Sequence, residues 1–96
     1  MINLKSSRVG SEYLVCLCDS NLIGRTLEEG EVQLRVPASF YGDKVVSEKI
    51  AIDELKNATI INALGIEAIE LVKKLFKLDK VIMINGVPHA QIFSIK

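Results

Sequence analysis

Short apolar segments near both ends of the chain have the patterns of β-strands. In segment 31–36, Val32, Leu34 and Val36 alternate with polar residues and are expected to face the core. Segment 12–19 has six consecutive apolar residues between two acids, which predicts a strand covered at least partly on both faces. The predicted strands are 2–6, 12–19, 31–36, 81–84 and 92–95, and a turn at 8–11 joins the first two as a hairpin.

Two segments in the middle of the chain have the 3.6-residue apolar period of amphipathic helices. Ser47 can cap a helix that runs from Glu48 to about Leu64, with Asn62 on its mostly apolar face, and Gly65 ends this pattern. A second helix is expected from Ile66 to about Leu78. Because asparagine is mildly unfavourable inside a helix, Asn62 should form either a buried structural hydrogen bond or a ligand contact.

Two further segments have the composition of turns and loops. Between residues 19 and 30, capping residues and glycines are spaced as in two short helical turns, with Arg25 between them. Pro37 ends the preceding strand, and residues 38–43 are expected to form a loop with two adjacent aromatic residues, Phe40 and Tyr41. These aromatic side chains either close the core or form a surface on which a partner stacks.

The order of these segments predicts an α+β fold, a two-layer sandwich of about five short, mostly antiparallel strands with two main helices on one face. Asn85 and Gly86 lie between apolar segments and are typical of a type I′ hairpin turn. Pro88 lacks an amide proton, so it belongs at a strand start, at an edge or in a widened loop. We therefore expect residues 86–89 to be stiff and partly unpaired.

The composition is that of a globular protein with balanced charge. The chain has 96 residues, 49% apolar and 25% charged, so we expect one domain spanning residues 1–96. No apolar run approaches the roughly 18–20 residues of a membrane span, and residues 1–5 lack signal-peptide features, so a cytoplasmic protein is expected. Twelve basic and twelve acidic side chains cancel, which disfavours non-specific nucleic-acid binding but not contact with structured RNA through a local patch. The basic cluster Lys73, Lys74, Lys77 and Lys80 is expected to be a solvated helix face.

Few side chains in the sequence have chemical reactivity. Cys16 and Cys18 point to the same face of a strand, cannot easily bridge each other, and are expected to be reduced and buried. His89 is the only histidine, and no glycine-rich phosphate loop, nucleophile elbow or metal-ligand motif accompanies it. No cofactor or metal ion is therefore expected. His89 either begins the last strand as a structural residue or is held by the stiff segment for function.

Several separated strings of the sequence occur together in one known family. They are Cys18-Asp19 with Leu22-Ile23-Gly24-Arg25, Phe40-Tyr41-Gly42, Asn57-Ala58-Thr59 with Asn62 and Gly65, and Gly86-Val87-Pro88-His89-Ala90-Gln91-Ile92. On these strings the chain resembles, over essentially its whole length, an archaeal family called domain of unknown function 424, from which Asp43 is a minor departure. The resemblance implies a small archaeal cytoplasmic protein of compact α/β design and supplies no activity. Its archaeal setting prompts the hypothesis of an association with RNA or translation.

The sequence leaves two classes of function open, of which we favour the first. The first is a non-enzymatic binding domain that docks on RNA, a ribonucleoprotein or a protein partner, with side chains at turns and strand ends: Arg25, Tyr41, Asn62, Gly86, Pro88, His89 and Gln91. The second is a small enzyme with His89 as general acid or base, oriented by Asp19 or Asp43, or paired with Cys18 as nucleophile. A chain of this size has little room for a deep pocket, which disfavours the enzyme. Pairing of sheet edges in a homodimer is compatible with either function.

Overall fold

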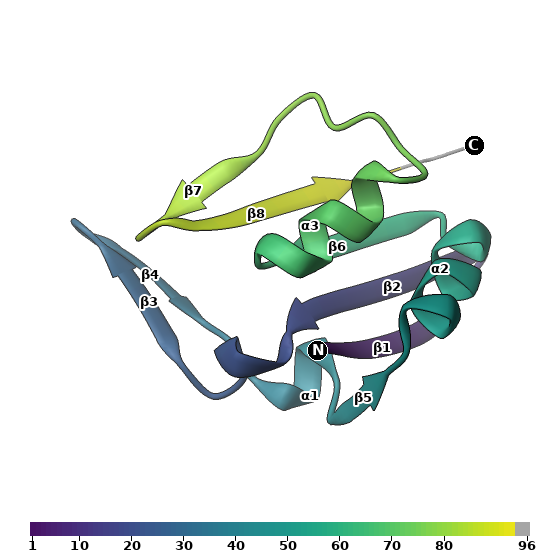
Figure 1. The fold of residues 1–96 in the computed structure, drawn as a ribbon, viewed down its shortest axis with the longest axis horizontal. Coiled ribbons are helices and arrows are strands. Elements are labelled where there is room, and N and C mark those ends of the chain that lie inside the picture. The colour runs from purple at the N-terminus through teal and green to yellow at the C-terminus, as the bar shows by residue number, and fades with distance from the viewer. Residues whose placement is uncertain (94–96) are drawn as a thin grey trace.

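The computed structural model describes residues 1–93 as two β-sheets and three α-helices (Figure 1). The strands are β1 (Ile2–Val9), β2 (Glu12–Asp19), β3 (Thr26–Glu29), β4 (Val32–Arg35), β5 (Lys44–Val46), β6 (Ile60–Leu64), β7 (Ile82–Ile84) and β8 (Val87–Ile92). The helices are α1 (Ala38–Tyr41), α2 (Glu48–Asn57) and α3 (Ile66–Lys73), and a short 3₁₀ helix spans Ser20–Leu22. The α+β class predicted from the sequence is confirmed, whereas the prediction of about five strands is wrong, because the described residues form eight.

The main sheet has six strands in the order β5-β1-β2-β6-β8-β7, and β3 and β4 form a separate hairpin. Strands β2 and β6 run parallel, and all other neighbours in the main sheet are antiparallel. The hairpin of the first two strands is confirmed, with Ile2 opposite Asp19 and Val9 opposite Glu12. The outer strands are β5 and β7, and pairing of two copies along such an edge stays a prediction.

Helices α2 and α3 cover one face of the main sheet (Figure 1). Apolar residues of both helices pack there against strands β1, β2, β6 and β8. The buried members of this core are Ile2, Leu4, Val15, Leu17, Ala51, Leu55, Ala58, Ile61, Ala63, Ala68, Ile69, Leu71, Val72 and Ala90. Within residues 1–93, no helix is long and apolar enough to cross a membrane.

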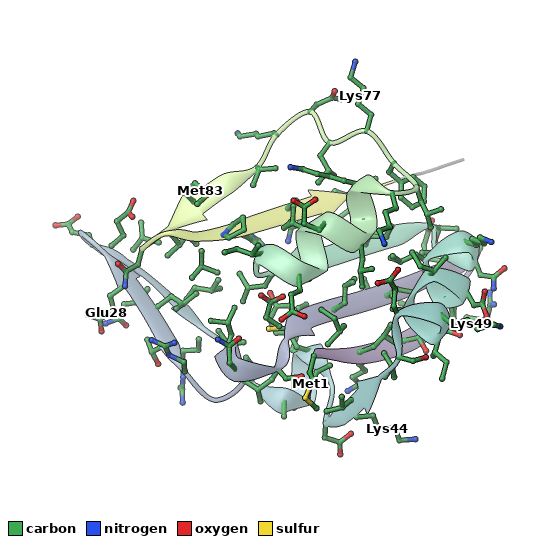
Figure 2. The ribbon with its side chains drawn as sticks, in the orientation of Figure 1. Met1, Glu28, Lys44, Lys49, Lys77 and Met83 are labelled. Atoms are coloured by element: carbon green, nitrogen blue, oxygen red, sulfur yellow. The ribbon has the colours of Figure 1, made fainter. Side chains whose placement is uncertain are left out.

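The opposite face of the sheet is covered over only part of its area. Hairpin β3–β4, the 3₁₀ helix and α1 pack on one end of it, and the buried residues there are Cys16, Cys18, Leu22, Leu27, Val36, Tyr41, Leu64 and Ile84. Around this covered end, side chains of β1, β7 and β8 on the same face are exposed: Lys5, Ile82 and Gln91, followed by Phe93 after the last strand. We call these four residues the open sheet face. Lys5 and Gln91 lie at the two ends of a row whose middle members, Cys16 and Asn62, are buried. Figure 2 shows side chains filling the space between the helices and the sheet.

The predicted helix from 48 to about 64 is wrong in its second half. Ser47 does cap α2, since its Oγ accepts a hydrogen bond from Ile50 N at 3.2 Å. The helix ends at Asn57, however, and residues 60–64 form β6. Thr59 causes this change: its amide donates to Tyr13 O at 2.9 Å and its Oγ1 accepts from Tyr13 N at 2.7 Å, which directs the chain into register with β2. Asn62 therefore lies on a strand.

Four other expectations need correction. Residues 26–29 form strand β3, because all four pair with β4 and the side chain of Leu27 is buried in the core. Residues 38–41 form α1 instead of a loop, with Tyr41 buried at its end. Helix α3 ends at Lys73, well before residue 78. Val32 is exposed, because the end of hairpin β3–β4 projects beyond the sheet (Figure 1).

The predicted last strand, 92–95, begins earlier than expected. Strand β8 starts at Val87, directly after a turn in which Asn85 and Gly86 have φ of 50° and 78°. Both positive values confirm the type I′ turn. Residues 94 and 95 lie outside the described residues.

Candidate functional site

Asn62 is the centre of a polar network on the partly covered face of the sheet. It is 7% exposed and lies on β6, next to Cys16 of β2 and Gln91 of β8. Its Oδ1 accepts a hydrogen bond from the hydroxyl of Tyr41 on α1 at 3.0 Å. His89 of β8 places its Nε2 3.2 Å from the same oxygen. The structure therefore brings together Tyr41, Asn62, His89 and Gln91, which the sequence predicted as binding residues.

Burial and hydrogen bonding keep the titratable groups around Asn62 neutral. Burial lowers the pKa of His89 and so favours the neutral imidazole. Its contact with an acceptor oxygen places the proton on Nε2, which leaves Nδ1 as an acceptor. Burial also raises the pKa of Tyr41, with a smaller contribution from the nearby Cys18 and Cys16, so the phenol stays protonated and donates. The network is thus a set of neutral hydrogen-bonding groups.

Gln91 connects this network to the open sheet face. It lies directly opposite Asn62 in the register of β6 and β8, and its side chain is exposed. His89 and Gln91 occupy alternate positions of β8 and point to the same face, and Phe93 follows the end of the strand. Together with Lys80 and Ile82 they line a shallow hollow of about 220 Å³. Phe93 is 61% exposed, so an aromatic ring lies beside an exposed amide and a half-buried imidazole.

Pro88 and Gly86, two further predicted binding residues, lie away from this hollow. Pro88 is buried on the opposite face, and its carbonyl accepts a hydrogen bond from Gly65 N at 2.9 Å. Pro88 is the second residue of β8, which agrees with the expected strand start, whereas the alternatives of an edge strand and a widened loop are wrong, because β8 lies between β6 and β7. Strand β6 ends at Leu64, so no neighbouring strand requires the amide proton that Pro88 lacks. Gly86 is exposed in the turn before β8.

Arg25 also lies apart from Asn62. It follows the 3₁₀ helix and lines a separate small hollow at the base of hairpin β3–β4, together with Thr26 and Arg35. The structure therefore divides the seven predicted binding residues between a network on the sheet, a turn, the helix-covered face and the hairpin base.

The groups proposed to assist His89 in catalysis have other positions. Asp19 binds the start of α3: its Oδ1 accepts from Ala68 N at 2.8 Å and its Oδ2 from Glu67 N at 3.2 Å. Asp43 is exposed and lines a different hollow, near β1 and β5. Cys18 is fully buried, and burial raises the pKa of its thiol to about 12. Within residues 1–93, no three His, Cys, Asp or Glu side chains gather closely enough to hold a metal ion.

Sequence reasoning missed three residues that line these hollows, Phe93, Lys80 and Arg35. The signal for Phe93 was its spacing of two from Gln91 and four from His89, the spacing of residues on one face of an extended chain. The predicted strand began at Ile92 and so separated them. Lys80 was grouped with helix lysines, although it lies between α3 and β7. Arg35 lies between half-buried Leu34 and buried Val36 and had no distinguishing signal.

The fold and the network define a small α+β domain in which a mixed sheet is covered by two helices on one face and partly open on the other. The model of the family described as "Protein of unknown function (DUF424)" matches residues 7–95, and the chain belongs to this family. The resemblance noted in the sequence is thereby confirmed.

A solved structure supports the same fold. The chain is similar to the protein described as "Crystal structure of an uncharacterized conserved protein from Methanopyrus kandleri", with a TM-score of 0.83 and 27% sequence identity. The match covers 97% of this chain and 90% of that chain. No curated protein matches the chain significantly.

Proposed function

We propose that this chain is a non-enzymatic binding domain whose open sheet face contacts a single-stranded segment of RNA. The observation that carries the proposal is that His89 and Gln91 of β8 and Phe93, directly after β8, line one hollow, with Phe93 61% exposed. An exposed aromatic ring beside hydrogen-bonding side chains is a suitable platform for a planar base. Unstacked bases of RNA are recognised by such stacking together with hydrogen bonds to their edges.

The neighbouring side chains have the chemistry that this recognition requires. The exposed amide of Gln91 offers both a donor and an acceptor to the edge of a base. Nδ1 of neutral His89 adds an acceptor at the side of the hollow. Lys80 lines the same hollow. Its ammonium group at the margin is suited to a phosphate of a strand lying across the sheet. Lys5 is exposed on the same face, directly opposite Cys16, but its Nζ donates a hydrogen bond to Ser39 O at 2.6 Å.

The same geometry favours binding over acid–base catalysis at His89. The polar partner of its ring is the carbonyl oxygen of an amide, which orients the imidazole without stabilising an imidazolium as a carboxylate does. Asp19, the carboxylate considered for this role, is engaged with the backbone of α3. A neutral, fixed imidazole is better suited to accept a hydrogen bond than to transfer protons.

Binding of a fluorescently labelled, mixed-sequence, single-stranded oligoribonucleotide tests the proposal by anisotropy. Loss of one stacked base is worth about 1–3 kcal/mol, so Phe93→Ala should weaken binding roughly 5- to 150-fold at 1.4 kcal/mol per tenfold. Gln91→Ala should weaken it less. Ile66→Ala is the matched control, because Ile66 is 64% exposed on α3, over the other face.

The outcomes separate the proposal from its alternatives. Unchanged thermal unfolding of Phe93→Ala shows that a loss of binding is not a loss of fold, as expected for an exposed side chain. Absence of binding by the wild type, or equal binding by wild type and Phe93→Ala, contradicts the proposal. Equal weakening by Ile66→Ala would assign the binding to non-specific apolar contact.

A further inference from the structure

The base of hairpin β3–β4 carries a second hollow, distinct from the open sheet face. Two segments line it, 24–26 before and within β3, and 35–37 at the end of β4. Its volume is about 110 Å³, half that of the hollow beside Phe93, so it suits a small group. Arg25 and Arg35 are both lining residues and both are exposed, so the hollow has two positively charged residues at its wall.

Backbone hydrogen bonds fix the two segments against each other. Gly24 N donates to Val36 O at 2.7 Å, and Val36 N donates to Arg25 O at 3.0 Å. Next along the ladder, Thr26 and Arg35 are cross-strand partners. The bond from Val36 to Arg25 flanks this pair, so Thr26 and Arg35 form a non-hydrogen-bonded pair, the type in which facing side chains lie closest. The side chains of Thr26 and Arg35 therefore lie close to each other.

Within residues 1–93, no carboxylate forms an ion pair with either arginine of this hollow. Among the ion pairs within residues 1–93, Lys49 and Lys74 have carboxylate partners, and neither Arg25 nor Arg35 has one. The acid on the same face of β3 is Glu28, labelled in Figure 2, and it accepts a hydrogen bond from Gln33 at 3.1 Å. Two exposed guanidinium groups held on a hairpin base repel each other unless an anion lies between them.

We propose that this hollow binds one phosphate group through Arg25, Arg35 and the hydroxyl of Thr26. Guanidinium groups match phosphate oxygens with two parallel hydrogen bonds each, and a threonine hydroxyl supplies a further donor. The inference rests on the proposed function only for the source of the group, a phosphodiester of the bound RNA, because a free phosphate ion has the same chemistry.

Titration with inorganic phosphate, followed by amide chemical shifts, tests the site itself. Chloride is exchanged for phosphate at constant ionic strength. The shifts of residues 24–26 and 35–36 should change saturably in the wild type and not in Arg25→Gln/Arg35→Gln. The control Arg8→Gln/Lys77→Gln removes equal charge elsewhere: Arg8 lies over the ring of Tyr13, and Lys77 lies beyond α3 (Figure 2). This control should respond like the wild type.

Two results overturn the site. One is the absence of saturable shifts at the hollow in the wild type, and the other is an equal response of the arginine double variant. Sulfate, with the same geometry, should compete with phosphate if the site is real.

The salt dependence of oligoribonucleotide binding identifies the source of the phosphate. Loss of one phosphate contact to a single strand should lower the slope of log affinity against log salt by about 0.7. A smaller slope for Arg25→Gln/Arg35→Gln, with the control unchanged, assigns the group to the RNA backbone. Phosphate binding without any RNA binding would support the phosphate site and contradict the proposed function. RNA binding that depends on Phe93 but not on Arg25 or Arg35 would support the proposed function and contradict the assignment of the phosphate to the RNA.

Discussion

Replacing Asn62 should destabilise the fold mainly through the tyrosine that it leaves behind. In Asn62→Leu the hydroxyl of Tyr41, a residue only 2% exposed, loses its acceptor at 3.0 Å. His89 loses the same acceptor, but it is only half-buried, so water can replace that bond. An unsatisfied buried donor costs about 1–3 kcal/mol, and we expect Asn62→Leu to lower the free energy of unfolding by this amount.

The variant Tyr41→Phe tests where that free energy resides. Alone, it leaves Oδ1 of Asn62 with the Nε2 of His89 at 3.2 Å, so the loss should be only about 0.5–1.5 kcal/mol. The double variant Tyr41→Phe/Asn62→Leu has no buried hydroxyl without an acceptor. It should therefore be at least as stable as Asn62→Leu, with a coupling energy of about 0.5–1.5 kcal/mol or more.

Urea unfolding followed by circular dichroism measures these differences, since the chain has no tryptophan to report on unfolding. The slopes against urea concentration should be equal for the four proteins, so that midpoints report stability. For a chain of this size, about 1 kcal/mol shifts the Tm by roughly 4–8 °C. If the double variant loses the sum of the two single losses, the hydrogen bond from Tyr41 to Asn62 does not couple them and the reasoning is refuted.

Three further predictions concern the residues around the site. In Gly65→Ala, where φ is +110°, the new Cβ would lie 2.3 Å from Cγ of Asp19. The hydrogen bonds from Asp19 to the start of α3 should therefore break, and the free energy of unfolding should fall by about 2–4 kcal/mol. A denaturation experiment that shows almost no loss contradicts this account. Because burial lowers the pKa of His89 in the folded protein, its contribution to stability is complete above about pH 6.5 and is lost as the pH falls toward the folded pKa. His89→Gln should remove this part of the pH dependence of stability. Identical profiles of stability against pH for the wild type and His89→Gln would show that the imidazole is not desolvated. Burial raises the pKa of Cys16 to about 11 and of Cys18 to about 12, so both should react with thiol reagents no faster than the protein opens, and rapid labelling of the folded protein would contradict their burial.

The elements that were predicted correctly are those specified by residues close together in the sequence. The bounds of β2 agree with the apolar run 12–19, since six consecutive apolar residues have no other stable placement in a small domain. The turn at Asn85 and Gly86 follows from the backbone preferences of these two residues. Ser47 likewise caps α2 through a bond within four residues of sequence.

Strand β6 shows why other elements were not predictable. Its residues continue the apolar stripe of the preceding helix, so periodicity alone supports a longer helix. What decides the outcome is long-range pairing with β2 and the hydrogen bonds between Thr59 and Tyr13, 46 residues apart. Residues 26–29 were misassigned for the same reason, because their capping pattern is weaker than pairing with β4.

The composition of the candidate site was predictable, but its arrangement was not. Tyr41, Asn62, His89 and Gln91 were identified as polar or aromatic residues at predicted turns and element ends. Their proximity depends on the register that places Asn62 opposite Gln91, which follows from the sheet topology and not from any local pattern. Pro88 was assigned to a partly unpaired segment, because a proline fits inside a sheet only where the neighbouring strand ends. The end of β6 at Leu64 cannot be inferred from the residues around Pro88.

Photochemical cross-linking of a bound oligoribonucleotide tests the central claim most directly. The wild-type protein and a uridine-rich single strand are irradiated, digested and analysed by mass spectrometry for the peptide that carries the nucleotide. The account predicts a cross-link within the segment that contains His89, Gln91 and Phe93, and its loss in Phe93→Leu. Cross-links confined to α2 or α3, or binding of RNA without any cross-link to this segment, would contradict it.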